Sequence, residues 1–242
     1  MHLYSPRVTE EEIGASASAD LDGWLFFQIA AGHITLPILV STLLFAKTVS
    51  AHPAVVTVCI TWILSGVFST LLYYVGQHTG PEPSHGLCVA QASLLGAVPT
   101  MTCSALLLLA YRVWRTWDGR NIEDLPETRR QKYLKLVIYV IPFIVFGLFV
   151  AIGVNLAINH PDRVNREQRF FYCSLAWAQF SNAVEVISTI MCFAAVALQV
   201  NVIVKAIRYW RALRDGNYLT DDRLSLVWRS SVFTLYLFGS TL

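Results

Sequence analysis

The residue with the clearest capacity for chemistry is Glu185, which lies within the apolar stretch "LAWAQFSNAVEVISTIMCF" of this 242-residue chain. Asn182 lies three residues earlier, and Ser188 and Thr189 lie three and four residues later. At helical spacing these side chains share one side, with Gln179 at its margin. Because a charged group is costly in lipid, we expect the stripe to face the interior of a helix bundle. Glu185 could act there as a counter-ion for a ligand or an ion, or it could be neutral and hydrogen-bonded to another helix.

Two further polar residues lie in apolar stretches, Gln91 and His33. Gln91 could face the same cavity, so the candidate ligand-binding set is Gln91, Gln179, Asn182 and Glu185. For His33 we expect a hydrogen-bonded packing role, which is common for a lone histidine in a span.

The other titratable residues do not favour catalysis. Intramembrane aspartyl proteases need two aspartates within their spans, and the apolar stretches contain none. The GxSxG motif of serine hydrolases is absent, and the six histidines are scattered, so neither a zinc site nor a bis-histidine haem site can be assembled. We expect no enzyme activity, no metal and no cofactor.

The candidate residues lie in apolar stretches, and the composition of the chain indicates that these stretches span a membrane. Hydrophobic residues make up 55% of the chain, charged residues only 14%, and the mean hydropathy is +0.51. A soluble domain carries roughly a quarter charged residues. Five stretches are long enough to cross about 30 Å of hydrocarbon as helices, and they run approximately over 24–46, 54–75, 87–114, 133–157 and 174–205. We expect an all-α membrane protein whose partner is the lipid bilayer, with no nucleic-acid partner.

A sixth apolar stretch, 227–242, reaches the last residue of the chain. Its length gives roughly 24 Å of helix, which is marginal for a crossing. We therefore expect the chain to end within the sixth helix, as a fragment or a truncated product. Prolines and glycines within the stretches predict kinks and close helix approach; they are Pro99, Pro142, Gly96, Gly147 and Gly153.

The positions of Lys and Arg predict the orientation of the spans. The segment 1–23 carries one arginine against five acidic residues and lacks a signal-peptide pattern, so we expect it to be retained and extracellular. The links after the first, third and fifth stretches carry Lys or Arg, whereas the link 76–86 has neither. Only the link after the fourth stretch does not fit this alternation, because it carries Arg163, Arg166 and Arg169. The positive-inside rule therefore places the N-terminus outside the cell.

This orientation divides the five cysteines. Cys88 lies at the outer end of the third stretch and Cys173 at the outer start of the fifth, on the side where disulfides persist. We predict a disulfide between them, the alternative being two unpaired interfacial cysteines. Cys59, Cys103 and Cys192 fall within stretches, where a thiol usually behaves as a small buried apolar group.

An outside N-terminus, a disulfide from the third helix to the second outer loop, and basic inner loops together resemble a G-protein-coupled receptor. More narrowly, "AHPAVVTVCITWILSGV" and "GQHTGPEPSHGLCVAQASLLGAVPT" resemble a family of fungal seven-helix proteins common in basidiomycetes. Its motifs correspond here to His52-Pro53, Gly80 to Pro83 and Leu87 to Ser93. The motif-bearing part is a small share of the chain, and the rest agrees in hydropathy and topology only. The resemblance implies a receptor-like bundle, and it brings no known ligand.

The predicted inner surface carries a second group of candidate residues. The third stretch ends in "LAYRVW", so Arg112 has the position of the receptor arginine, without the acidic residue that precedes it in receptors. Beyond the fifth stretch, Lys205, Arg208 and Arg211 are spaced by three residues. This basic stripe could contact a cytoplasmic signalling protein such as a G protein, or anionic lipid. Ordinary anchoring at the membrane interface explains the same residues.

We therefore expect a receptor-like protein of the plasma membrane, in which an unknown extracellular ligand shifts the packing of the helices. The alternative is a polytopic transporter or channel with Glu185 in its pathway. Transporters usually contain paired repeats with broken helices, and the sequence has no matching halves.

Overall fold

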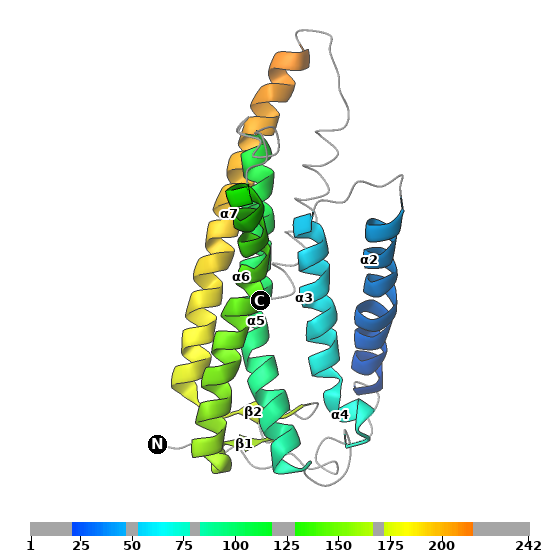
Figure 1. Cartoon of the computed structure of the whole chain (residues 1–242), viewed down its shortest axis with the longest axis vertical. Coiled ribbons are helices and arrows are strands. Elements are labelled where there is room, and N and C mark those ends of the chain that lie inside the picture. Colours follow the sequence, from blue (N-terminus) through cyan, green and yellow to red (C-terminus); the bar gives the residue numbers. More distant parts are fainter. Residues whose placement is uncertain (1–20, 47–52, 78–82, 118–128, 167–171, 215–242) are drawn as a thin grey trace.

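The structure, a computed structural model, describes residues 21–46, 53–77, 83–117, 129–166 and 172–214. Within these ranges the chain is mainly helical, with a small two-stranded sheet at one end of the long helices (Figure 1). In chain order the elements are η1 (Ile29–Thr35), α2 (Leu36–Phe45), α3 (Pro53–Ser69), α4 (Leu71–Tyr74), α5 (His85–Trp117), α6 (Arg129–Asn159), η2 (Pro161–Arg163), β1 (Val164–Asn165), β2 (Ser174–Leu175) and α7 (Ala178–Arg214).

Four described helices are long and apolar enough to cross a membrane, and they cover Leu21–Phe45, His85–Arg115, Tyr139–Asn159 and Ala178–Arg208. Helix α3 is apolar but shorter, with 17 residues. Large apolar side chains are exposed along the first helix, α6 and α7, among them Phe26, Phe27, Ile38, Phe45, Ile144, Leu148, Ile190 and Phe193. Such surfaces are rare on soluble proteins and natural in lipid, so the chain has the character of an all-α integral membrane protein. The predicted sixth span, 227–242, lies outside the described residues.

The first helix widens over η1, where the Leu36 N–H donates to the carbonyl of Ala31, five residues back. Pro37 follows directly and has no N–H to donate to the carbonyl of His33, four residues before it. A local π-helical turn is one way in which a membrane helix re-satisfies backbone groups that a proline frees. The proline therefore accounts for the irregular turn that carries His33.

The second predicted span, 54–75, is not one continuous helix. Helix α3 ends at Ser69 and α4 resumes at Leu71. At the break, the hydroxyl of Ser69 donates to the Ser65 carbonyl at 2.8 Å, and that of Thr70 to the Gly66 carbonyl at 2.9 Å. Hydroxyls that bond to a carbonyl four residues back compete with the helix backbone. An apolar pattern does not report this competition, so the sequence prediction missed the break.

Helix α4 ends at Tyr74 and is closed by Gly76, which has a φ of 70°. The N–H of Gln77 donates to the Leu72 carbonyl at 2.9 Å, and that of Gly76 to the Tyr73 carbonyl at 3.0 Å. These two bonds and the left-handed glycine form a Schellman motif, which closes a helix while satisfying its last carbonyls. The chain then leaves the bundle towards α5.

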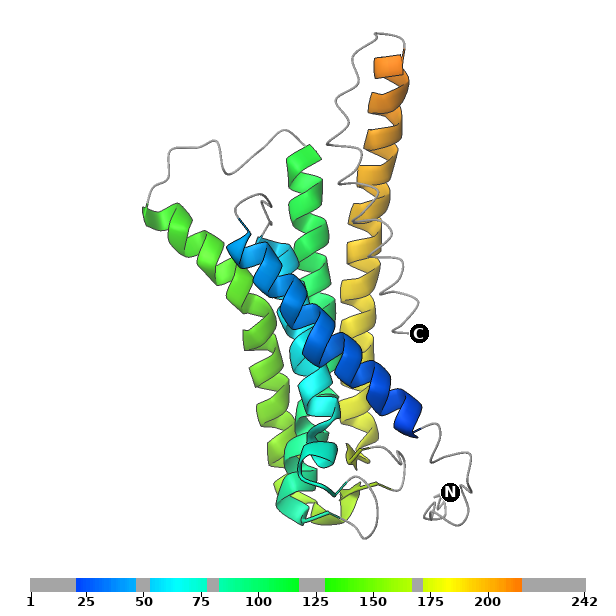
Figure 2. The same cartoon turned by 90° about the vertical axis from the view of Figure 1, so that its right-hand side faces the viewer.

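Helix α5 is the centre of the bundle, because it contacts α3, α6, α7 and both strands. In the most apolar 18-residue segment of α5, 61% is buried, compared with 22% in the corresponding segments of α6 and α7. Helix α6 crosses α5 and leans away from it towards its own N-terminal end (Figure 2). Pro142 lies inside α6, and a proline removes one helical hydrogen bond and allows such a change of direction.

Helices α5, α6 and α7 meet at the ring of Phe180. A Cβ at Gly96 of α5 would lie 3.0 Å from the Phe180 ring, and one at Gly153 of α6 would lie 3.5 Å from it. The ring also packs against Phe149, with centroids 6.3 Å apart. Two of the three glycines expected to allow close approach therefore do so, while a Cβ at Gly147 would meet nothing within 4 Å.

The connection between α6 and α7 forms the sheet at one end of the bundle (Figure 1). Strands β1 and β2 are antiparallel, with Val164 opposite Leu175 and Asn165 opposite Ser174. The fifth predicted span, 174–205, therefore starts too early, because its first two residues belong to β2 and α7 begins at Ala178. Apolar residues in a covered loop look like the start of a span when only hydropathy is considered.

The glycine contacts predict a difference between Gly96→Ala and Gly147→Ala. Both changes gain about 1 kcal/mol of helix propensity, but at Gly96 the new methyl group meets the buried Phe180 ring. Overpacking of this kind costs typically 1–3 kcal/mol. We expect a lower melting temperature in detergent for Gly96→Ala and an unchanged or higher one for Gly147→Ala. Equal melting temperatures would contradict the described junction.

Candidate functional site

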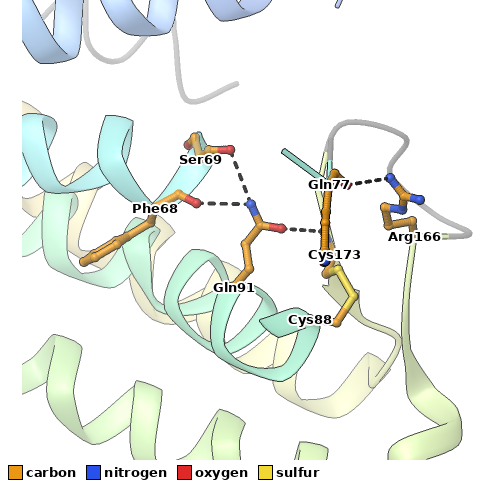
Figure 3. Close-up of a disulfide and its surroundings, with 7 residues drawn as sticks. All are labelled: Phe68, Ser69, Gln77, Cys88, Gln91, Arg166 and Cys173. Atoms are coloured by element: carbon orange, nitrogen blue, oxygen red, sulfur yellow. Dashed lines mark hydrogen bonds between the residues drawn. A yellow bond between two sulfur atoms is a disulfide. The ribbon is translucent and has the colours of Figure 1, made fainter. Parts of the chain in front are cut away.

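One end of the bundle, which we call the disulfide end, is organised around Cys173. The structure brings Cys88 of α5 and Cys173 to disulfide distance, with their Cα atoms 5.2 Å apart although the two residues are 85 positions apart in sequence. Gln91 lies three residues after Cys88 and thus on the same face of α5, and its Oε1 accepts a hydrogen bond from the Cys173 N–H at 2.9 Å (Figure 3). Residue 173 is therefore held through both its sulfur and its backbone.

The other half of the Gln91 amide reaches the end of α3. Its Nε2 donates to the carbonyls of Phe68 at 3.2 Å and Ser69 at 3.3 Å (Figure 3). The last carbonyls of a helix lack intrahelical partners, so Gln91 caps α3 from the neighbouring helix. The Gln91 side chain is completely buried, and its amide joins α3, α5 and the loop before α7. It is thus occupied in holding the fold, and it does not lie with the other three candidate ligand-binding residues.

Two of the arginines that do not fit the positive-inside pattern have specific partners at the disulfide end. Arg163 has its guanidinium 5.9 Å from the centroid of the Trp177 ring, and an exposed ion pair at 3.3 Å with Asp162. Arg166 donates to the Gln77 carbonyl at 3.4 Å, which links β1 to the end of α4 (Figure 3). Arg169 lies outside the described residues. These contacts give the two described arginines a structural reason to be at this end.

His33 connects the first helix to the break after α3. Its Nδ1 lies 2.8 Å from the Tyr74 hydroxyl, and its Nε2 lies 3.2 Å from the Thr70 hydroxyl. Since Thr70 donates its proton to the Gly66 carbonyl at 2.9 Å, it accepts from His33 Nε2–H, and Tyr74 then donates to Nδ1. The helices can approach because Gly32 lies against Gly66. The hydrogen-bonded packing role expected for His33 is the one that the structure shows.

The polar stripe of α7 does not face the described helices. Glu185, Asn182 and Gln179 are exposed, whereas Ser188 is buried on the side that packs against α5. Within the described residues, therefore, no helix covers Gln179, Asn182 or Glu185. The face of α7 that packs on α5 instead carries Phe180, Val184, Ser188, Ala195, Gln199 and Val202. Spacing shows which residues share a side of a helix, but it does not choose the side that meets a neighbour.

The opposite end of the bundle, which we call the basic end, carries the other candidate residues. Arg112 is buried, donates to the Tyr139 hydroxyl of α6 at 3.1 Å, and lies 5.9 Å from the centroid of that ring. Lys205 of α7 lies 5.4 Å from the centroid of the Trp114 ring of α5. Cation–π contacts of this kind favour close packing of the helix ends. Arg112 is thus buried between α5 and α6 at this end.

The remaining members of the predicted basic stripe differ in exposure. Arg208 is exposed on α7, and the side chain of Arg211 lies outside the described part of the structure. Of the candidate residues at this end, Arg208 is therefore exposed, while Arg112 is buried.

The structure also brings together two residues that sequence reasoning left apart. Cys103 of α5 and Cys192 of α7 have their sulfur atoms 3.0 Å apart. The sequence offered one signal for this, since each lies about 21–23 Å along its helix from the disulfide end. This estimate shows that the two cysteines lie at a similar depth, but not that they face each other. Their contact therefore depends on how α5 and α7 pack.

No protein-family model matches the sequence, and no curated protein matches it significantly. The functional argument therefore depends on the geometry of the two ends and of the helices that join them.

The role of Gln91 can be tested by Gln91→Leu. The substitution leaves three buried backbone groups without their partner, and an unsatisfied buried group costs about 1–3 kcal/mol. We expect a clear fall in melting temperature and incomplete formation of the Cys88–Cys173 disulfide. Gln179→Leu makes the same chemical change at an exposed position and should alter neither quantity.

A second variant separates the two halves of the amide. In Gln91→Glu an ionised carboxylate still accepts from Cys173 but cannot donate to Phe68 and Ser69. This variant should melt earlier than the wild type while forming the disulfide more completely than Gln91→Leu. If all three proteins melted alike, Gln91 would have no part in holding the disulfide end.

Proposed function

We propose that the protein is a receptor-like integral membrane protein, with an outside N-terminus and a topology like that of the seven-helix receptors. The supporting observation is that the disulfide end and the basic end lie at opposite ends of the same helices, α5 and α7 (Figure 1). A protein that passes a signal across a bilayer needs a fixed surface on one side and a movable contact on the other, joined by rigid elements. The resemblance to fungal seven-helix proteins is part of this proposal.

The disulfide end is proposed to be extracellular. A disulfide there persists only in an oxidising compartment, and the link 76–86 beside it has no Lys or Arg. The disulfide and the Gln91 hydrogen bonds fix the loop before α7 against α5 and α3. This rigid surface is where an extracellular ligand would bind, with the plasma membrane as the proposed location.

The basic end is proposed to be the cytoplasmic contact for a signalling protein such as a G protein. In the described state the buried Arg112–Tyr139 hydrogen bond holds α5 against α6. Helix α6 leans away from α5 towards its N-terminal end (Figure 2), beyond the point where Tyr139 packs against the apolar cluster of Leu109 and Val113. A ligand that favours a second packing state would break this bond and expose Arg112 at the end that also carries Arg208. No catalytic step is part of the proposal.

Glu185 has a separate role in the proposal. With Asn182 and Gln179 it forms an exposed polar face on α7, about 10 Å along the helix from its start. A carboxylate on such a face needs a polar partner within the membrane. A cationic group of a ligand would serve, and so would a permeating ion in a transporter.

The proposed sidedness is tested with epitope tags at the N-terminus and within the link 118–128. On intact cells we expect antibody to label only the N-terminal tag, because the Lys and Arg residues that flank the other link hold it inside. After permeabilisation both tags should be labelled. Labelling of only the 118–128 tag on intact cells would reverse the orientation and remove the receptor proposal.

The signalling role is tested with Tyr139→Phe, which removes the acceptor of the Arg112 hydrogen bond and keeps the ring. In cells that co-express heterotrimeric G proteins, we expect this variant to raise basal G-protein dissociation, measured by resonance energy transfer. Tyr111→Phe, a tyrosine change one residue before Arg112, should not raise it. The transporter interpretation would replace the receptor if no G protein responded and Glu185→Gln abolished an ion flux.

A further inference from the structure

Cys103 and Cys192 are the closest pair of thiols in the described residues outside the disulfide. Their sulfur atoms lie 3.0 Å apart, which is only about 1 Å longer than a disulfide bond. The two residues come from different helices, α5 and α7, and are separated by 89 positions in sequence. Local chain geometry therefore does not explain the contact, which depends on how α5 and α7 pack.

The pair lies inside the bundle and near the middle of the spans. On α5, Cys103 is about 22 Å along the helix from Cys88 and about 13 Å from Arg112. Cys103 is buried and Cys192 is partly exposed. Small molecules that dissolve in the hydrocarbon of the bilayer can therefore reach the pair from the Cys192 side, while water-soluble oxidants meet the bilayer first.

The surroundings of the pair are polar and adaptable. The hydroxyls of Thr102 and Ser188 neighbour the Cys103 thiol. Ser188 lies one turn before Cys192 on α7 and is buried as well. Pro99 lies one turn before Cys103 and leaves the helix one hydrogen bond short, which makes α5 easier to bend at this depth. A shift of about 1 Å, which a disulfide requires, is within the reach of side-chain rotation and a small bend.

We propose that Cys103 and Cys192 form a redox-active thiol pair within the membrane, whose oxidant is a lipid-soluble quinone. The two thiols lose two electrons and two protons and form one S–S bond, while the quinone gains both and becomes the hydroquinone. Quinones are the terminal oxidants of thiol pairs in some membrane systems. The new bond joins α5 to α7 halfway along the bundle, and a dithiol reductant restores the two thiols.

The redox chemistry of this pair needs only the packing of α5 on α7. It therefore does not depend on whether the protein is a receptor. It would add a second covalent link to the one at the disulfide end. With both links present, α7 would be fixed to α5 at two depths, whereas α6 would remain free to move.

The test uses the full chain in detergent or in vesicles, treated with tetramethyl-1,4-benzoquinone. Digestion without reductant and mass spectrometry should find a peptide that joins Cys103 to Cys192, lighter by two hydrogen atoms than its two components. In the denatured protein, maleimide should label the three cysteines outside the Cys88–Cys173 disulfide before oxidation and only Cys59 after it. The Cys88–Cys173 peptide in the same digest shows that the chain is folded.

Two variants serve as controls. Cys192→Ser should keep maleimide labelling of Cys59 and Cys103 after quinone treatment, and Cys59→Ser should lose all labelling. The proposal is overturned if the Cys103–Cys192 peptide is absent both before and after quinone treatment while the Cys88–Cys173 peptide is present. It is also overturned if Cys192→Ser loses its labels, because the oxidation would then not need the pair.

Discussion

The buried amide of Gln91 is the interaction on which the disulfide end depends. A membrane helix cannot leave backbone groups unsatisfied where water is scarce, yet α3 stops at Ser69 and the loop before α7 turns back over α5. One side chain meets both needs, since it donates to the end of α3 and accepts from Cys173. With the disulfide three residues away on the same helix, the loop has little freedom to leave the bundle.

Helix α5 is central because it contacts α3, α6 and α7. Small residues let its neighbours approach, as at Gly96 beside Phe180, and its two ends carry different chemistry. At one end a covalent bond and buried hydrogen bonds fix the packing, and at the other α5 meets α6 through Arg112 and Tyr139. At the second end an apolar cluster that includes Leu109, Val113 and Val202 packs beside this polar contact.

The sequence predicted the helices better than their contacts. Hydropathy indicated the spans that the structure describes, and the distribution of charge placed Cys88 and Cys173 at a common end. It did not show the break at Thr70, since hydroxyls that compete with the backbone do not change an apolar pattern. It also did not show which face of α7 packs in the described bundle, which is the face that carries Phe180 and Val184.

By itself the sequence determined which residues lie in apolar helices, which of them share a helix face, and which end of each helix is basic. These are local properties, set by composition and by the 3.6-residue period. The tertiary structure alone decided that Gln91 caps another helix, that Arg112 is buried beside Tyr139, and that Cys103 meets Cys192. Such contacts depend on how far each helix is rotated about its axis and on which helix lies beside it. The sequence that connects two helices specifies neither.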